Sequence, residues 1–259
     1  MKIAVAGWSV NRRFRAPENA LKLIDFPAFV RQEFGIDAVE LNSPFFASTD
    51  AAYLADLRAA TKKAKSRIVH ISVDGQGDLA AVDEAARQEA VRKHLAWFAI
   101  AKAVGSPGFR ANTGGKAGVN PETIAQCIKS FKDLAREGER SGLNILIENH
   151  GGISGDPDII VRIMEEVASE RIGTCPDFGN APDATRYAFL EKIMPYAKVC
   201  HAKFYEFGPT GEDTKVDAKR CVEICTKAKF VGYCAIEFEG QGEDVDGVKK
   251  SAALLKKYI

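Results

Sequence analysis

The chain has 259 residues, of which 46% are apolar and 27% charged, so it can bury a sizeable core. Its formal net charge of +1 provides no broad attraction for nucleic acid or a membrane surface, and neither is expected as a partner. No apolar run approaches the length of a transmembrane helix, and the first residues lack the pattern of a secretory signal peptide. Six cysteines without Cys-x-x-Cys spacing indicate reduced, buried thiols, which favours a cytoplasmic protein.

Short apolar runs alternate eight times with longer amphipathic stretches. We expect the runs to be strands, at residues 3–6, 38–41, 68–73, 108–112, 143–148, 172–177, 199–204 and 234–238. We expect helices near residues 26–35, 51–65, 80–104, 121–141, 157–169, 184–195, 215–229 and 244–258. Asn120-Pro121-Glu122 and Asp156-Pro157-Asp158 have the residues of helix starts, and Gly35, Gly105 and Gly142 lie where helices should end.

Strand-then-helix units without a composition break or linker predict one domain over residues 1–259, an α/β fold of the (β/α)8 TIM barrel type. A doubly wound open sheet is the alternative. That fold needs a glycine-rich phosphate turn after its first strand, and Gly7-Trp8-Ser9-Val10 is not one. In a barrel the active site lies at the C-terminal ends of the strands, so residues there are the candidates for chemistry.

The last four expected strands each supply a side chain that can bind a metal, namely Glu148, Asp177, His201 and Glu237. Three carboxylates and one imidazole suit one divalent ion, with Mn²⁺, Mg²⁺ or Co²⁺ favoured and Zn²⁺ a further candidate. Each residue alone has an ordinary alternative, since Asp177 could cap a helix and Glu237 could pair with Lys203. Unpaired acids inside a barrel mouth are costly, so a bound cation accounts better for the four together.

Other polar residues near the strand ends are candidates for binding substrate. His150, Lys203 and Glu239 each lie two residues beyond a proposed ligand, so on a strand each pair shares a face. Glu239 is also an alternative to Glu237 as the eighth-strand ligand. Four further candidates for holding substrate hydroxyls are Glu40, His70, Arg110 and Asn112, for which an ordinary polar role at the barrel mouth is an equal alternative. Asn180, after the sixth expected strand, is also a candidate for binding substrate.

Four segments together resemble the sugar phosphate isomerase/epimerase superfamily with the xylose-isomerase-like barrel: Ile147-Glu148-Asn149-His150-Gly151, Asp177-Phe178-Gly179-Asn180, His201-Ala202-Lys203 and Ile236-Glu237-Phe238-Glu239-Gly240. The resemblance covers nearly the whole chain but is not specific to one activity. It implies that Glu148 and Glu237 bind the metal and exchange protons with substrate, and that Asp177 and His201 complete the ligand set. Keto-sugar 3-epimerases of this superfamily have a histidine where Asn180 lies and a substrate arginine that is not evident here, and both departures argue against a 3-epimerase.

The resemblance implies an isomerase or epimerase that acts through an enediolate on a keto-sugar or a related polyol or hydroxy-keto compound. The metal acidifies the C–H beside a carbonyl, one glutamate removes the proton, and the other returns it to the opposite face or the adjacent carbon. Two alternatives would use the same metal site. One is a lyase or dehydratase, and the other is an enzyme that cleaves keto-glycosides. Trp8 and Phe46 are candidates for an apolar wall against the sugar ring.

Two other interpretations use the same scaffold. Endonuclease IV-like enzymes hold three zinc ions with many histidines, whereas this chain has only four histidines and a near-neutral charge, so an abasic-site nuclease is not expected. A barrel that only binds ligands would not need both Glu148 and Glu237 as proton carriers. The expected partner is a small-molecule sugar, and a homo-oligomer is compatible with a sequence that has no diagnostic interface.

Overall fold

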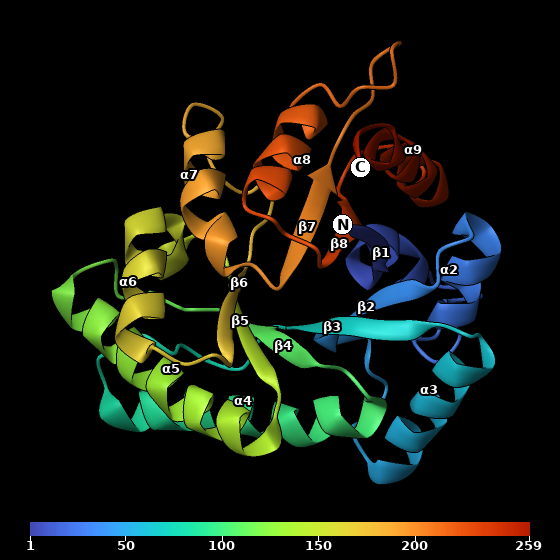
Figure 1. The fold of residues 1–259 in the computed structure, drawn as a ribbon. Coiled ribbons are helices and arrows are strands. Elements are labelled where there is room, and N and C mark those ends of the chain that lie inside the picture. The colour runs from blue at the N-terminus through green and yellow to red at the C-terminus, as the bar shows by residue number, and fades with distance from the viewer.

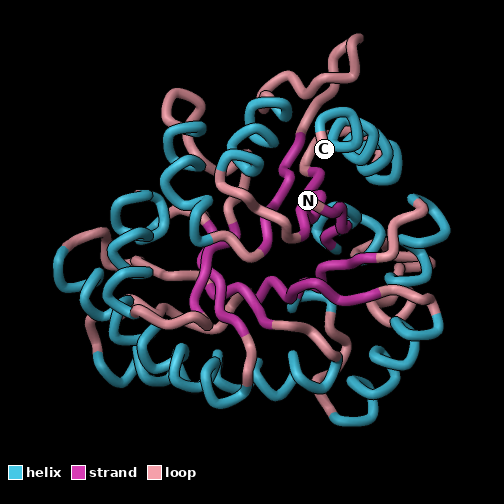
Figure 2. Tube along the Cα trace, viewed as in Figure 1, coloured by secondary structure: helices cyan, strands magenta, loops and turns pink.

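A computed structural model describes all residues, 1–259, and its eight parallel strands form one sheet (Figure 1). The strands are β1 (Lys2–Ala6), β2 (Ala38–Asn42), β3 (Arg67–Val73), β4 (Gly108–Ala111), β5 (Asn144–Glu148), β6 (Ile172–Cys175), β7 (Val199–Phe204) and β8 (Tyr233–Phe238). The helices are α1 (Asn11–Phe14), α2 (Phe26–Phe34), α3 (Ala51–Lys63), α4 (Glu84–Val104), α5 (Pro121–Ser141), α6 (Pro157–Val167), α7 (Arg186–Ile193), α8 (Ala218–Lys227) and α9 (Asp244–Tyr258). Figure 2 shows the strands at the centre with the helices around them, which confirms the predicted TIM barrel.

The barrel closes between β6 and β7. The strands pair in the order β6-β5-β4-β3-β2-β1-β8-β7, and two isolated bridges, Thr174 with Ala197 and Asp177 with His201, join the two ends of this order. The amide of His201 donates to the carbonyl oxygen of Pro176 at 2.9 Å. This closure places Asp177, just beyond β6, directly beside His201 of β7.

The two faces of each strand have different surroundings, because successive side chains point in opposite directions. Val39 and Leu41 of β2 belong to the main hydrophobic core, which also contains Val30 of α2. Glu40 lies between them in sequence and is fully buried, so its side chain faces the barrel interior. Small residues form a separate cluster on this inner face: Ala4, Ala6, Ala38, Val69 and Ala235.

Local sequence signals explain most of the observed helix boundaries. The side chain of Asn120 accepts two hydrogen bonds of 3.0 Å from amides in the first turn of α5. Gly35 and Gly105 follow α2 and α4 in the left-handed conformation, with φ of 66° and 83°. These predicted ends are therefore confirmed.

Several predicted elements are shorter in the structure, and two of these differences have a clear local cause. The helix expected over 215–229 begins only at Ala218, because Asp213 accepts a 2.8 Å hydrogen bond from the amide of Val216 and holds this segment as a loop. The strand expected over 172–177 ends at Cys175, because Pro176 has no N–H with which to continue the ladder. Asp177 therefore lies in the loop after β6.

The six cysteines are all free and buried, as predicted. Burial raises the pKa of the Cys175 thiol to about 12, so this thiol stays protonated near neutral pH. No helix combines the length and the apolar composition that crossing a membrane requires.

Candidate active site

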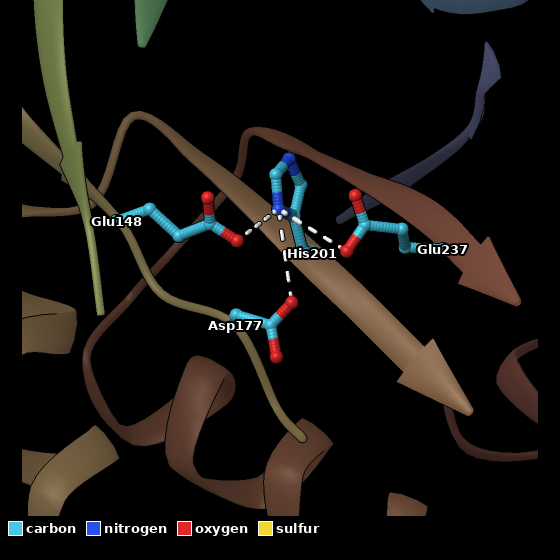
Figure 3. Close-up of side chains that lie close together, drawn as sticks. All are labelled: Glu148, Asp177, His201 and Glu237. Atoms are coloured by element: carbon cyan, nitrogen blue, oxygen red, sulfur yellow. Dashed lines mark hydrogen bonds and ion pairs between the residues drawn. The ribbon is translucent and has the colours of Figure 1, made fainter. Parts of the chain in front are cut away.

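Four side chains from β5 to β8 meet at the C-terminal end of the barrel: Glu148, Asp177, His201 and Glu237. One ligand atom from each lies within 4.8 Å of the others, and all four residues are buried. His201 Nδ1 lies 2.9 Å from Glu148 Oε1, 3.7 Å from Asp177 Oδ2 and 3.9 Å from Glu237 Oε2. Figure 3 shows Glu148 and Glu237 on opposite sides of His201, with Asp177 completing the group. We call these four residues the ligand cluster.

The ligand cluster has unsatisfied acceptors. Glu148 Oε2 and Asp177 Oδ2 are buried and accept no hydrogen bond. Arg110 Nε lies 3.0 Å from Glu148 Oε2, but the two atoms lack hydrogen-bond geometry. A buried acceptor without a partner costs about 1–3 kcal/mol, and more when it is charged. Because a divalent ion satisfies such oxygens and prefers this donor set, the residues present fit a metal.

Glu40 and Ser72 hold the other side of the His201 ring. Nε2 of His201 lies 2.8 Å from Glu40 Oε2, and Ser72 Oγ donates to Glu40 Oε1 at 2.8 Å. Burial disfavours the charged imidazole, but the carboxylates of Glu40 and Glu148 outweigh it and hold the pKa of His201 well above its usual value. Carboxylates that orient ligand histidines in this way are common around metal sites. From the sequence, Glu40 was expected only to hold substrate hydroxyls, whereas its carboxylate faces His201.

The Asn149 side chain fixes the position of Asp177. Its Nδ2 donates to the Asp177 carbonyl at 3.0 Å, and its Oδ1 accepts from the Asp177 amide at 2.7 Å. The amides of Gly179 and Asn180 donate to Asp177 Oδ1 at 2.7 and 2.8 Å, which leaves Oδ2 free at the cluster. This role of Asn149 was not predicted, although the position of the residue directly after Glu148 at a strand end was a signal.

Lys203 lies among the acids of β6 to β8. Its Nζ is 2.9 Å from Glu237 Oε2, 3.5 Å from Asp177 Oδ2 and 3.2 Å from Glu239 Oε1. It also donates to Asn180 Oδ1 at 2.9 Å, while Asn180 Nδ2 donates to Glu148 Oε1 at 3.1 Å. Glu239 lies outside the ligand cluster and pairs with Lys203 instead.

Arg110 and Asn112, both predicted to bind substrate, are engaged mainly by the protein. Nη1 of Arg110 donates to Asp74 Oδ1 at 2.6 Å, to Asn112 Oδ1 at 2.9 Å and to the Val73 carbonyl at 3.0 Å. Asn112 Nδ2 donates to the same Asp74 oxygen at 2.9 Å. This network holds the guanidinium beside Glu148.

A cavity of about 170 Å³ opens onto the ligand cluster. Of the proposed substrate-binding residues, His150, Arg110, Lys203 and Glu239 line it, together with Glu148, Glu237 and Trp8. His70 does not line this cavity. Burial lowers the pKa of His70 well below its usual value, and its Nε2 has no hydrogen-bond partner. Phe46 does not line it either, because its ring packs edge-on against Trp97 with centroids 5.5 Å apart.

The surrounding charges and burial lower the pKa values of two acids of the ligand cluster and raise the pKa of the third. Burial disfavours ionisation of Glu148, but His201 and a neighbouring arginine outweigh burial and hold the pKa of Glu148 well below its usual value. The pKa of Glu237 is also lowered, because Lys203 and His201 outweigh its burial. Burial and the two glutamates together raise the pKa of Asp177 to about 7, against the effect of Lys203. Both glutamates are therefore carboxylates at neutral pH.

Known proteins share both the sequence pattern and the fold of this chain. Residues 30–258 match the model of the family described as xylose isomerase-like TIM barrel, and the chain belongs to that family. Solved structures have the same fold. A 3-keto-D-glucoside 4-epimerase from E. coli has a TM-score of 0.78 and 16% sequence identity, and the match covers 99% of each chain. A D-psicose 3-epimerase from Clostridium cellulolyticum has a TM-score of 0.80 and 10% sequence identity, and the match covers 100% of this chain and 99% of that one. A stretch of 74 residues is 32% identical to the C-glycoside deglycosidase alpha subunit of Arthrobacter globiformis, and spans 26% of this chain but only 21% of that protein.

Proposed function

We propose that this protein is a divalent-metal-dependent isomerase or epimerase that acts through an enediolate on a keto-sugar or a related polyol or hydroxy-keto compound. The observation that carries the proposal is the placement of two buried glutamates, Glu148 and Glu237, on opposite sides of His201 in one cavity. Two carboxylates facing one bound substrate can remove a proton from one face and deliver a proton to the other. The family membership and the sugar epimerases among the structural neighbours support the same class of reaction.

Glu148, Asp177, His201 and Glu237 would hold the metal, for which Mn²⁺, Mg²⁺ and Co²⁺ suit the oxygen-rich donor set best. When bound, the ion would polarise the substrate carbonyl and stabilise the negative charge of the enediolate. Glu40 would keep Nδ1 of His201 directed at the cluster, because it binds the opposite ring nitrogen.

The two glutamates would carry the protons. Both have lowered pKa values, so either can remove the proton from the carbon beside the carbonyl. The glutamate on the opposite side, once protonated, delivers its proton to the other face for epimerisation or to the neighbouring carbon for isomerisation. His150, Lys203 and Glu239 line the cavity and would bind substrate hydroxyls, whereas Asn112 and Asn180 would act by positioning Arg110 and Lys203.

A second candidate is a keto-glycoside-cleaving enzyme that expels a substituent from the same enediolate. The stretch shared with the C-glycoside deglycosidase alpha subunit favours it, although the match spans about a fifth of that protein. We further propose a cytoplasmic enzyme with a small-molecule sugar as its substrate and without a nucleic-acid partner.

Deuterium incorporation tests the proposal. The protein, loaded with Mn²⁺, Mg²⁺ or Co²⁺, is incubated in deuterated water with free and phosphorylated ketoses and with 3-keto sugars, and the products are identified by NMR. Exchange at a carbon beside the carbonyl, with an epimer or isomer as product, is the expected result. Elimination products would identify the second candidate, and absence of exchange with every sugar and metal would overturn the proposal.

A further inference from the structure

A second cavity, of about 340 Å³, adjoins the cavity at the ligand cluster. It is lined by residues 112–116 after β4, by residues 150–152 after β5 and by Ser154. The two cavities share one residue, His150, which lines both. They also meet where Asn112, on the wall of the second cavity, donates at 2.9 Å to Asp74, on the wall of the first.

The sizes of the two cavities bear on the size of the substrate. Pockets that hold small molecules have volumes of roughly 300–1,000 Å³. The cavity at the cluster, about 170 Å³, is smaller than this range, whereas the two cavities together fall within it. We propose that the second cavity is a subsite for a further sugar unit, so that the substrate is a keto-disaccharide and not a free monosaccharide. This inference rests on the proposed function, because it assumes that the reacting keto-sugar occupies the first cavity.

The lining of the second cavity suits hydroxyl groups. No hydrophobic side chain lines it, which disfavours a flat aromatic group as the occupant. The imidazole of His150 is exposed and makes no hydrogen bond to the protein, and the amides of Gly114 and Gly151 donate to no protein acceptor. Lys116 adds an exposed ammonium donor. These groups can donate to sugar hydroxyls without breaking contacts within the protein.

The two loops hold each other in place, so the subsite is formed before a ligand binds. A Cβ at Gly152 would collide with the carbonyl oxygen of Gly114, and the Ile153 amide donates to that same oxygen at 3.2 Å. Asp78 accepts from the amides of Gly115 and Lys116 at 3.0 and 2.9 Å. Preformed sites avoid the entropic cost of ordering loops on binding.

A third cavity, of about 400 Å³, lies beyond Glu239 on the other side of the cluster. The Glu239 carboxylate, which pairs with Lys203 at 3.2 Å, lines both this cavity and the cavity at the ligand cluster. Its remaining lining includes three aromatic side chains, Tyr205, Phe207 and Phe238, besides further carboxylates and Lys250, whereas the cavity on the His150 side has no hydrophobic residue in its lining. We therefore assign the sugar subsite to the His150 side and use Lys250 as the matched control position.

The test compares deuterium exchange on keto-glucosyl disaccharides with exchange on the methyl glycosides of the same keto-glucosyl ring. For the wild-type protein loaded with Mn²⁺, kcat/KM should be at least about tenfold higher for a disaccharide. Lys116→Trp, which fills the cavity from an exposed position, should bring this ratio close to one, and Lys116→Ala should lower it by less. Lys250→Trp places the same side chain in the third cavity and should leave the ratio unchanged.

Equal kcat/KM values for both probes in the wild type would overturn the subsite, as would loss of the preference in Lys250→Trp but not in Lys116→Trp. A tenfold preference for phosphorylated monosaccharides would also overturn it and would identify the cavity as a phosphate site. If no probe exchanges deuterium, the proposed function fails, and calorimetry then decides the subsite separately. If the wild type binds a disaccharide and Lys116→Trp binds it more weakly, the result supports the subsite. If the wild type binds no disaccharide, the result overturns the subsite.

Discussion

Nε2 of His201 lies 2.8 Å from Oε2 of Glu40, although the two residues are 161 positions apart in the chain. Both side chains are fully buried, and Ser72 donates to the other Glu40 oxygen at 2.8 Å. The contact leaves Nδ1 of His201 as the ring nitrogen that faces the three acids of the ligand cluster. Glu40 therefore fixes the orientation in which His201 would meet a bound metal, although Glu40 is not part of the ligand cluster.

Replacing Glu40 should weaken metal binding. In Glu40→Gln the amide no longer provides a charged acceptor for His201, and we expect a loss of about 10–100-fold in Mn²⁺ affinity. Calorimetric titration of the metal-free protein measures this loss. Glu239→Gln is the matched control, because Glu239 lies outside the ligand cluster, and it should change the affinity little. An unchanged affinity in Glu40→Gln would show that His201 needs no such support.

Removing the metal should lower the thermal stability. Binding to the folded state alone adds about 2.7 kcal/mol when the free metal is at 100 times its Kd, because folding then includes the binding free energy. Scanning calorimetry should therefore show a higher Tm with Mn²⁺ than with a chelator. Asp177→Asn should abolish most of this difference, whereas Asp158→Asn, at an exposed carboxylate that pairs with Lys192, should retain it. The same Tm with metal and with chelator in the wild type would contradict a metal site.

Neutralising either proposed proton carrier, Glu148 or Glu237, should by itself slow proton exchange with the substrate. Glu148→Gln and Glu237→Gln keep the size of the side chain but cannot accept a proton, so each should slow C–H exchange by about 10²–10⁴-fold. Deuterium incorporation followed by NMR measures the rates, with metal content checked in each variant. Asp158→Asn, at an exposed carboxylate that pairs with Lys192, should retain the wild-type exchange. A variant that exchanges at the wild-type rate would remove its glutamate from proton transfer.

Metal affinity should rise with pH across neutrality. The pKa of Asp177 is about 7 in the metal-free protein and that of His201 is raised, so both groups are protonated below pH 7 and must release protons to bind a cation. Affinity for Mn²⁺ should therefore rise from pH 5.5 to 7.5, by about tenfold per pH unit for each proton displaced. Glu148 and Glu237 add nothing in this range, because their pKa values are lowered. Titrations at several pH values with an affinity independent of pH would contradict this assignment.

The alternation of strands and helices, and the acidic residues near the ends of the strands, could be predicted from the sequence, because both depend on local patterns. Short apolar runs alternate with amphipathic stretches, and residues such as Asn120 and Gly35 set helix ends through contacts with their own neighbours. Glu148 and Glu237 could be nominated for the same reason, since each lies at or next to the C-terminal end of its own strand, and His201 could be nominated as the one histidine within β7.

Only the tertiary structure decided which side chains meet across the barrel. The pairing of Glu40 with His201, and the placement of Arg110 beside Glu148, depend on strand register and barrel closure. Register in β2 shifts at an irregularity between Val39 and Glu40, which no local period reveals. The cavity between residues 112–116 and 150–154 likewise requires two loops from different strands to pack together. Periodicity determines what each strand presents, whereas long-range packing determines what that side chain faces.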